Sequence, residues 1–165
     1  MSWSLFKTKY LTLTGRQHVT TELFARTIAT AYDDVINLHF DSMTAGGKVI
    51  NSAPKLLPFY QGILSICTQN LNTHNDVMFL QQIGIYVQAY WAGIIIVGPT
   101  GTSSVLSSGI WTPIPVKQNF NVTILLDAMI MCFRNHIMTL TGLYVSSVIP
   151  GVSSPWSGAS LQTLP

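Results

Sequence analysis

The stretch Asp76–Gly98 constrains the fold more than any other part of this sequence. It is long and almost wholly apolar, and it carries no formal charge after its first residue. Apolar side chains repeat at three- and four-residue spacing on two adjacent stripes, and Gln81, Gln82 and Gln88 give the only polar edge. A helix that is apolar nearly all round is buried or lies in a membrane. The pattern therefore predicts a central buried helix that continues into the segment after it.

Two glycines, Gly84 and Gly93, interrupt this stretch. Each costs roughly 1 kcal/mol of helix propensity relative to alanine. A glycine is useful in a helix where a second backbone approaches closely. We therefore expect Gly84 and Gly93 to be close-packing positions.

Three further segments have the apolar spacing of amphipathic helices, Thr20–Phe40, Ala53–Asn70 and Val122–Met138. Thr20 and Asn75 are suited to cap the helices that follow them. Residues 48–51 and 139–149 are expected to be short strands. The fold class predicted is mainly α, with about four helices forming a compact bundle-like body in a single domain over residues 1–165.

Three segments are predicted to extend from this body. Residues 1–14 alternate in the two-residue period of a strand or extended arm. Residues 99–118 form a long loop rich in Gly, Ser, Thr and Pro, and loops of this length are often functional. Residues 150–165 are expected to be a C-terminal arm. The large apolar residues on these segments are the interface candidates Trp3, Trp111, Ile114, Trp156 and Leu161.

Charge is scarce. Charged residues make up 8 % of the 165 residues, against about 25 % in typical domains. None lies between Asp76 and Lys117, and none follows Arg134. A soluble monomer normally carries interspersed charges. Such a chain is expected to bury much of its surface against other subunits or to enter a membrane, and its net charge of +2 is too small to indicate nucleic acid.

No motif indicates catalysis or a cofactor. Ile94–Ser104 superficially resembles a phosphate-binding loop, but Ser104 stands where that loop needs its lysine. The histidines do not have the spacing of metal ligands, and the G-x-S-x-G pattern of a serine hydrolase is absent. Cys67 and Cys132 are expected to be reduced and buried. We therefore expect no enzyme, no cofactor and no metal.

The function predicted from these features is that of a structural subunit in a large symmetric assembly, such as a bacteriophage capsid, neck or tail. Its partners would be copies of itself and other subunits, and its location the virion. The segment Met1–Thr14 contains lysines and lacks the apolar core of a secretion signal. Two alternatives stay open: a small membrane protein that spans with residues 77–97, and a binding module that grips a glycan or peptide with the loop around Trp111.

Overall fold

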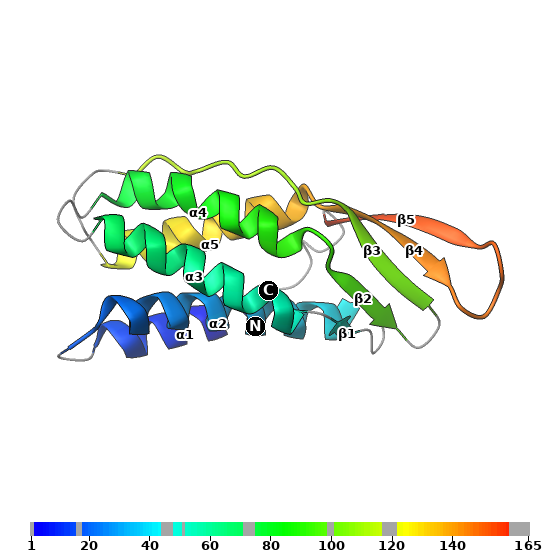
Figure 1. Ribbon diagram of the computed structural model, residues 1–165, viewed down its shortest axis with the longest axis horizontal. Coiled ribbons are helices and arrows are strands. Elements are labelled where there is room, and N and C mark those ends of the chain that lie inside the picture. The colour runs from blue at the N-terminus through cyan, green and yellow to red at the C-terminus, as the bar shows by residue number, and fades with distance from the viewer. Residues whose placement is uncertain are drawn as a thin grey trace.

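The chain folds into a helical body from which a β-sheet projects (Figure 1). A computed structural model describes residues 2–15, 18–43, 48–50, 52–70, 75–98, 101–116 and 122–158. Within these ranges there are five α-helices and a five-stranded antiparallel sheet. The predicted fold class, mainly α with minor β, is confirmed.

The first helix, α1, spans Ser2–Thr14, so the prediction of a strand or arm over residues 1–14 is wrong. Trp3, Phe6, Tyr10 and Leu13 recur at three- and four-residue spacing and are all buried. Side chains in the same segment also alternate with the two-residue period of a strand, and the segment can place only one of these two sets of residues against the core. Burial of these large side chains against the other helices selects the helical period.

Three of the predicted helices form close to their expected bounds. They are α2 at Thr21–Met43, α3 at Ser52–Asn70 and α5 at Val122–Met138. Thr20 caps α2 as predicted, because its hydroxyl oxygen accepts a hydrogen bond of 3.1 Å from the backbone N–H of Leu23. The apolar spacing in these segments therefore predicted both the existence and the limits of the helices.

The central stretch is a shorter helix than the sequence predicted. Helix α4 spans Asp76–Trp91 and is capped by Asn75, whose side chain accepts a hydrogen bond from the Met78 N–H. Gly93 then adopts φ +78°, and the chain enters strand β2 at Ile95–Gly98. The prediction of one helix over the whole stretch is wrong after Trp91. The cause is a left-handed glycine followed by a β-branched run.

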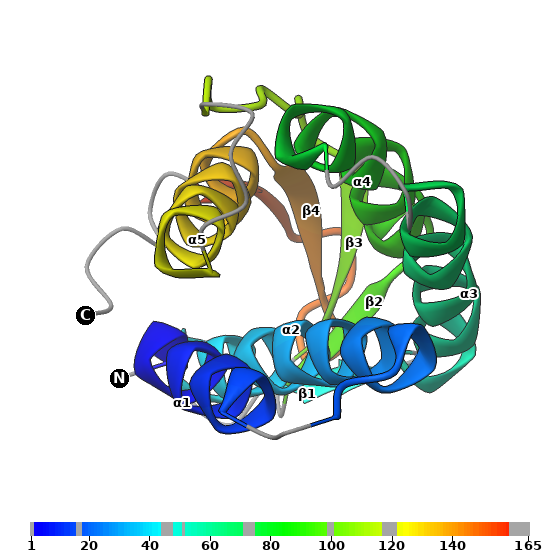
Figure 2. The same ribbon diagram turned by 90° about the vertical axis from the view of Figure 1, so that its left-hand side faces the viewer.

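Aromatic side chains fill the centre of the helical body, which Figure 2 shows end-on. Tyr32 of α2 is at the middle, with its ring centroid 4.6 Å from that of Phe133 and 5.4 Å from that of Tyr90. Its hydroxyl accepts a 2.7 Å hydrogen bond from the indole N–H of Trp91. Since this core joins α2, α4 and α5, these helices are held as one unit.

The sheet has the strand order β1-β2-β3-β4-β5, with every neighbouring pair antiparallel. Its remaining strands are β1 at Lys48–Ile50, β3 at Gly101–Ser107, β4 at Thr141–Ser146 and β5 at Ser153–Ser157. Strands β1 and β4 lie in the segments where short strands were predicted. Strands β3, β4 and β5 reach well beyond the ends of the helices (Figure 1); we term them, together with β2, the sheet arm.

The predicted membrane span over residues 77–97 does not form a single helix. Helix α4 has 16 residues and the chain turns after it. Among the described residues, no helix combines the length and apolarity needed to cross a bilayer.

Candidate assembly interface

The second half of the predicted docking loop lies against the helices of its own chain. Residues 108–116, here termed the strap, run along α4 and α5. The side-chain amide of Gln88 donates to the Gly109 carbonyl at 2.9 Å, and the backbone N–H of Ile114 donates to the Cys132 sulfur at 3.3 Å. The first half of the loop forms β3. The expectation of a structureless loop is therefore wrong for residues 101–116, because β3 pairs with β2 and β4 and the strap contacts the helices. Residues 99–100 and 117–118 lie outside the described part of the chain.

Trp111 anchors the strap. Its indole N–H donates a 2.7 Å hydrogen bond to the Leu80 carbonyl, and its ring centroid lies 5.7 Å from that of Phe133. A Cβ atom built at Gly84 would lie 2.2 Å from the Trp111 ring. Gly84 is therefore a close-packing position as predicted, but an indole of the same chain, rather than a backbone, occupies the space.

Gly93 has a different role from the one predicted. The nearest atom to a Cβ built there is the Lys55 amine at 3.7 Å, which is ordinary contact. Its positive φ is the constraint, since it ends α4 and directs the chain into β2. The close-packing prediction is wrong for Gly93.

The other predicted interface residues also pack within the chain. Trp3 is buried and stacks on Phe133, with ring centroids 6.0 Å apart. Trp156 is half-buried in β5 and covers Gly142, where a Cβ would lie 2.1 Å from its ring. Leu161 and the rest of residues 159–165 lie outside the described part of the chain. A tryptophan on an apparent arm looks the same in sequence whether it packs on its own chain or on a neighbour.

One face of the sheet arm is covered by the arm's own aromatic side chains. Tyr144 covers Gly101 much as Trp156 covers Gly142, and the Tyr144 hydroxyl would lie 2.7 Å from a Cβ at Gly101. Glycine opposite an aromatic side chain is a known way of filling one face of a sheet. Residues 150–158, the first part of the predicted C-terminal arm, are consequently integrated in the sheet rather than free.

The opposite face of the sheet arm, here termed the open face, is exposed, and none of its residues on β2–β5 is charged. Lys48 of the neighbouring strand β1 is in register with Val97 at its border. Residues directly opposite on neighbouring strands share a face, so the register places two rows across it. The rows are Ile95, Ser104, Leu143 and Pro155, and Val97, Thr102, Val145 and Ser153. Ile95 is 39 % exposed and Val145 is 45 % exposed.

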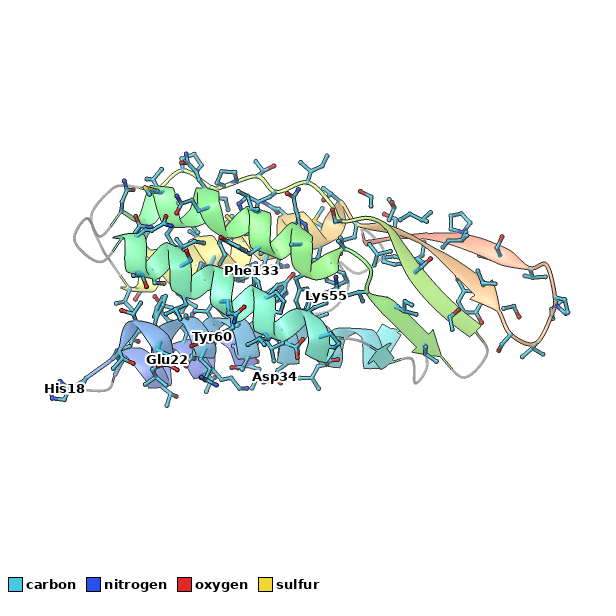
Figure 3. All side chains as sticks on the ribbon, in the orientation of Figure 1. His18, Glu22, Asp34, Lys55, Tyr60 and Phe133 are labelled. Atoms are coloured by element: carbon cyan, nitrogen blue, oxygen red, sulfur yellow. The ribbon has the colours of Figure 1, made fainter. Side chains whose placement is uncertain are left out.

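The absence of charge on β2–β5 contrasts with the helical body. There, Lys9 pairs with Asp34, and Arg26 donates to Glu22 at 3.0 Å while it lies over the Tyr60 ring. Figure 3 shows Glu22, Asp34 and Tyr60 on the side of the body formed by α1, α2 and α3. The surface of a soluble monomer normally carries interspersed charged side chains, so an uncharged open face is suited to contact with another protein surface.

The arm ends in a rigid apolar turn. The Val152 N–H donates to the Ile149 carbonyl at 3.3 Å, and Gly151 after Pro150 has φ +80°. Pro-Gly with this geometry matches a type II turn. Val148 is 66 % exposed and Ile149 is 57 % exposed. We term residues 147–152 the arm tip.

The outer edge of β5 is blocked at its centre. The backbone N–H of Gly158 donates to the Leu140 carbonyl, and that of Ser146 donates to the Val152 carbonyl. In an antiparallel pair of strands, hydrogen-bonded and non-hydrogen-bonded residue pairs alternate, so these two bonds identify the type of every pair between β4 and β5. Pro155 falls on a non-bonded pair, so its nitrogen faces the free edge, where a proline cannot donate. Within the sheet arm, the open face and the arm tip are therefore better suited to contact than this edge.

The buried titratable groups fit a packing role. Burial raises the pKa of Cys67 to about 11 and also raises that of Cys132. Both cysteines are free thiols, and Cys132 is buried as predicted, whereas Cys67 is only partly buried. Burial lowers the pKa of His136 to about 4. In the ranges that the structure describes, no three His, Cys, Asp or Glu side chains are grouped as metal ligands.

The residues of the open face and the arm tip were not predicted from the sequence. The short run Thr102–Ser107 bounded by Gly101 and the Pro150-Gly151 turn pair were signals that could have indicated a hairpin arm. A comparison of the chain with protein-family models, with curated proteins and with solved structures found no match.

Proposed function

We propose that this chain is a structural subunit of a large symmetric assembly, such as a bacteriophage capsid, neck or tail, in which the sheet arm contacts neighbouring subunits. The observation that carries the proposal is the projecting sheet with an exposed, uncharged face. Hydrophobic residues on that face, together with the arm tip, provide apolar area, and the hydroxyl groups between them can form hydrogen bonds across an interface.

The virion as the setting is supported by the composition. Only 8 % of residues are charged, and the charge-free segments 77–116 and 135–165 include every strand of the sheet arm as well as most of α4. Obligate interfaces resemble a domain core cut in half and tolerate few charges. A subunit that is always assembled has little need of a charged surface.

The alternative of a glycan- or peptide-binding module at Trp111 has less support. The indole N–H already bonds to Leu80, and the ring lies against Gly84 and Phe133. The indole N–H and the ring face of Trp111, which a glycan or peptide would contact, are thus already in contact with other residues of the chain.

The test is to measure native mass by analytical ultracentrifugation for the wild-type chain and for Val145→Lys. The wild type is expected to form species well above the 18.1 kDa of one chain. An unpaired ammonium buried at an interface costs several kcal/mol, so Val145→Lys is expected to weaken association by at least about 100-fold. Gln61→Lys, which adds the same charge to an exposed position on α3, is the matched control.

Two results would count against the proposal. One is a wild-type chain that stays monomeric at every concentration, and the other is equal weakening by Val145→Lys and Gln61→Lys. Far-UV circular dichroism of each variant separates loss of association from loss of fold.

A further inference from the structure

The outer side of α5 presents a regular row of exposed side chains. They are Ile124, Asp127, Met131, Arg134 and Met138, and the buried residues of α5 lie on its other side. Alternating steps of three and four residues place all five on one stripe of a helix. Figure 2 shows α5 at the edge of the helical body, where one of its sides faces away from the other helices. We term these five residues the α5 stripe.

The α5 stripe is apolar at both ends and at its centre. Ile124 is 52 % exposed, Met131 is 53 % exposed and Met138 is 36 % exposed. These three side chains are seven residues apart, which is the repeat with which one helix packs along another. The flexible thioether of methionine adapts to an irregular partner surface. The spacing therefore fits a second helix that lies along α5.

The two charges on the α5 stripe indicate which helix this is and in which direction it runs. Asp127 lies four residues before Met131, and Arg134 lies three residues after it. Within one helix they are about 10 Å apart along the axis, too far to face each other, since neighbours on a helix are three or four residues apart. A second α5, antiparallel to the first and related to it by a two-fold axis near Met131, brings Asp127 of each copy beside Arg134 of the other. A parallel second α5 in register would place like charges together, which is unfavourable at an interface.

We propose that α5 of a second copy of this chain packs antiparallel on the α5 stripe, with an Asp127–Arg134 ion pair on each side of Met131. Ile124 of each copy then lies near Met138 of the other. The contact is isologous, because both copies use the same surface. This inference rests on the assembly function proposed above for the presence of other copies, but it uses a surface separate from the sheet arm. A two-fold contact through α5 combined with a different contact through the arm extends an assembly beyond a dimer.

The test is charge reversal followed by mixing. Asp127→Arg leaves two positive charges on the stripe, and Arg134→Asp leaves two negative charges. Each variant alone places like charges together across the two-fold axis, so we expect its association to weaken by at least about 10-fold. An equimolar mixture of the two variants has opposite charges at both contacts and is expected to associate about as tightly as the wild type. Native mass is measured by analytical ultracentrifugation at low ionic strength, where charges are least screened.

Two further proteins separate this contact from effects of folding and of net charge. The double variant Asp127→Arg/Arg134→Asp carries both charges again, in exchanged positions, and is expected to associate without mixing. The matched control reverses an exposed ion pair on α2 with Glu22→Arg and Arg26→Glu, which change the net charge by the same amounts. These control variants are expected to associate as the wild type does, both separately and mixed. Far-UV circular dichroism checks that every variant is folded.

Two results would overturn the inference while leaving the assembly function standing. One is an assembled protein whose association neither α5 variant weakens, which would show that something other than a second copy of α5 lies on the stripe. The other is weakened association that neither the mixture nor the double variant restores. A wild-type chain that stays monomeric at every concentration would instead overturn the assembly function itself.

Discussion

Gly84 has no side chain at the point where the Trp111 ring meets α4, and this contact can be tested directly. Gly84→Ala raises intrinsic helix propensity by about 1 kcal/mol, yet its Cβ would lie 2.2 Å from the indole. Overpacking of this kind costs typically about 1–3 kcal/mol, so the clash outweighs the propensity. We expect a net loss of up to about 2 kcal/mol in the free energy of unfolding, measured by urea denaturation.

The control is a double-mutant cycle with Trp111→Ala, which removes the ring. In that background Gly84→Ala is expected to be neutral or to stabilise α4 by up to about 1 kcal/mol. An equal cost of Gly84→Ala in both backgrounds would show that the indole is not the cause.

His136 makes stability depend on pH. Its Nε2 lies 2.7 Å from the Ser108 carbonyl, so that nitrogen carries the proton, and Nδ1 is buried without a hydrogen-bond partner among the described residues. Burial lowers the pKa of the folded-state imidazole from 6.5 to about 4. Between these values the unfolded chain binds more protons than the folded chain, so the free energy of unfolding falls as pH decreases.

The contribution of neutral His136 to the free energy of unfolding is fully present above about pH 6.5 and is lost progressively down to about pH 4. The loss over this range is up to about 3 kcal/mol. It is measured by urea unfolding at several pH values. His136→Gln keeps a donor for the Ser108 carbonyl and does not titrate, so its stability is expected to fall less over the same window. Parallel pH profiles for the two proteins would contradict the assignment.

At the scale of the element, β5 is an edge strand whose pairing is limited by one residue. Pro155→Thr would supply the missing outward N–H at the centre of the edge. One added hydrogen bond contributes about 0.5–1.5 kcal/mol. We expect edge-to-edge association to begin at a concentration roughly 3- to 10-fold lower than in the wild type, measured by light scattering.

Ser154→Thr is the matched control for this change. It introduces the same residue type next to Pro155, at a position whose backbone already pairs with Tyr144 of β4. If both variants associate equally, the added threonine rather than the restored donor is responsible.

At the scale of the whole molecule, the helical body and the sheet arm depend on different parts of the sequence. The buried core lies mostly in α1–α5 and in the residues just after α4 and α5. Deletion of residues 150–165 removes β5 and uncovers Gly142. It is expected to keep the far-UV helical signal, lower the melting temperature and abolish assembly. Deletion of residues 159–165 alone keeps β5 and Trp156, so normal assembly by this shorter chain is the expected contrast, checked by native mass.

The sequence predicted the helices whose apolar spacing has a single interpretation. Val122–Met138 is a helix over the bounds expected, and Leu125, Ala128, Met129, Cys132, Phe133 and His136 face inward. The prediction was wrong where two periods coexist, as in Ser2–Thr14, and where an apolar run crosses from helix to strand, as after Trp91. The choice between periods depends on the surface that receives the apolar residues, which local sequence does not specify.

The sequence by itself determined that the chain carries little charge, that its helices are strongly apolar, and that Gly84 needs space on its helix. Only the tertiary structure decided that Trp111 of the same chain fills that space and that the predicted loop and tail pair into a projecting sheet. It also decided that Ile95 and Val145 are exposed on the open face, and that Val148, Ile149 and Val152 are exposed at the arm tip. The physical reason is that composition and periodicity fix how much apolar surface must be buried, whereas the partner that buries each part depends on contacts between residues far apart in the chain.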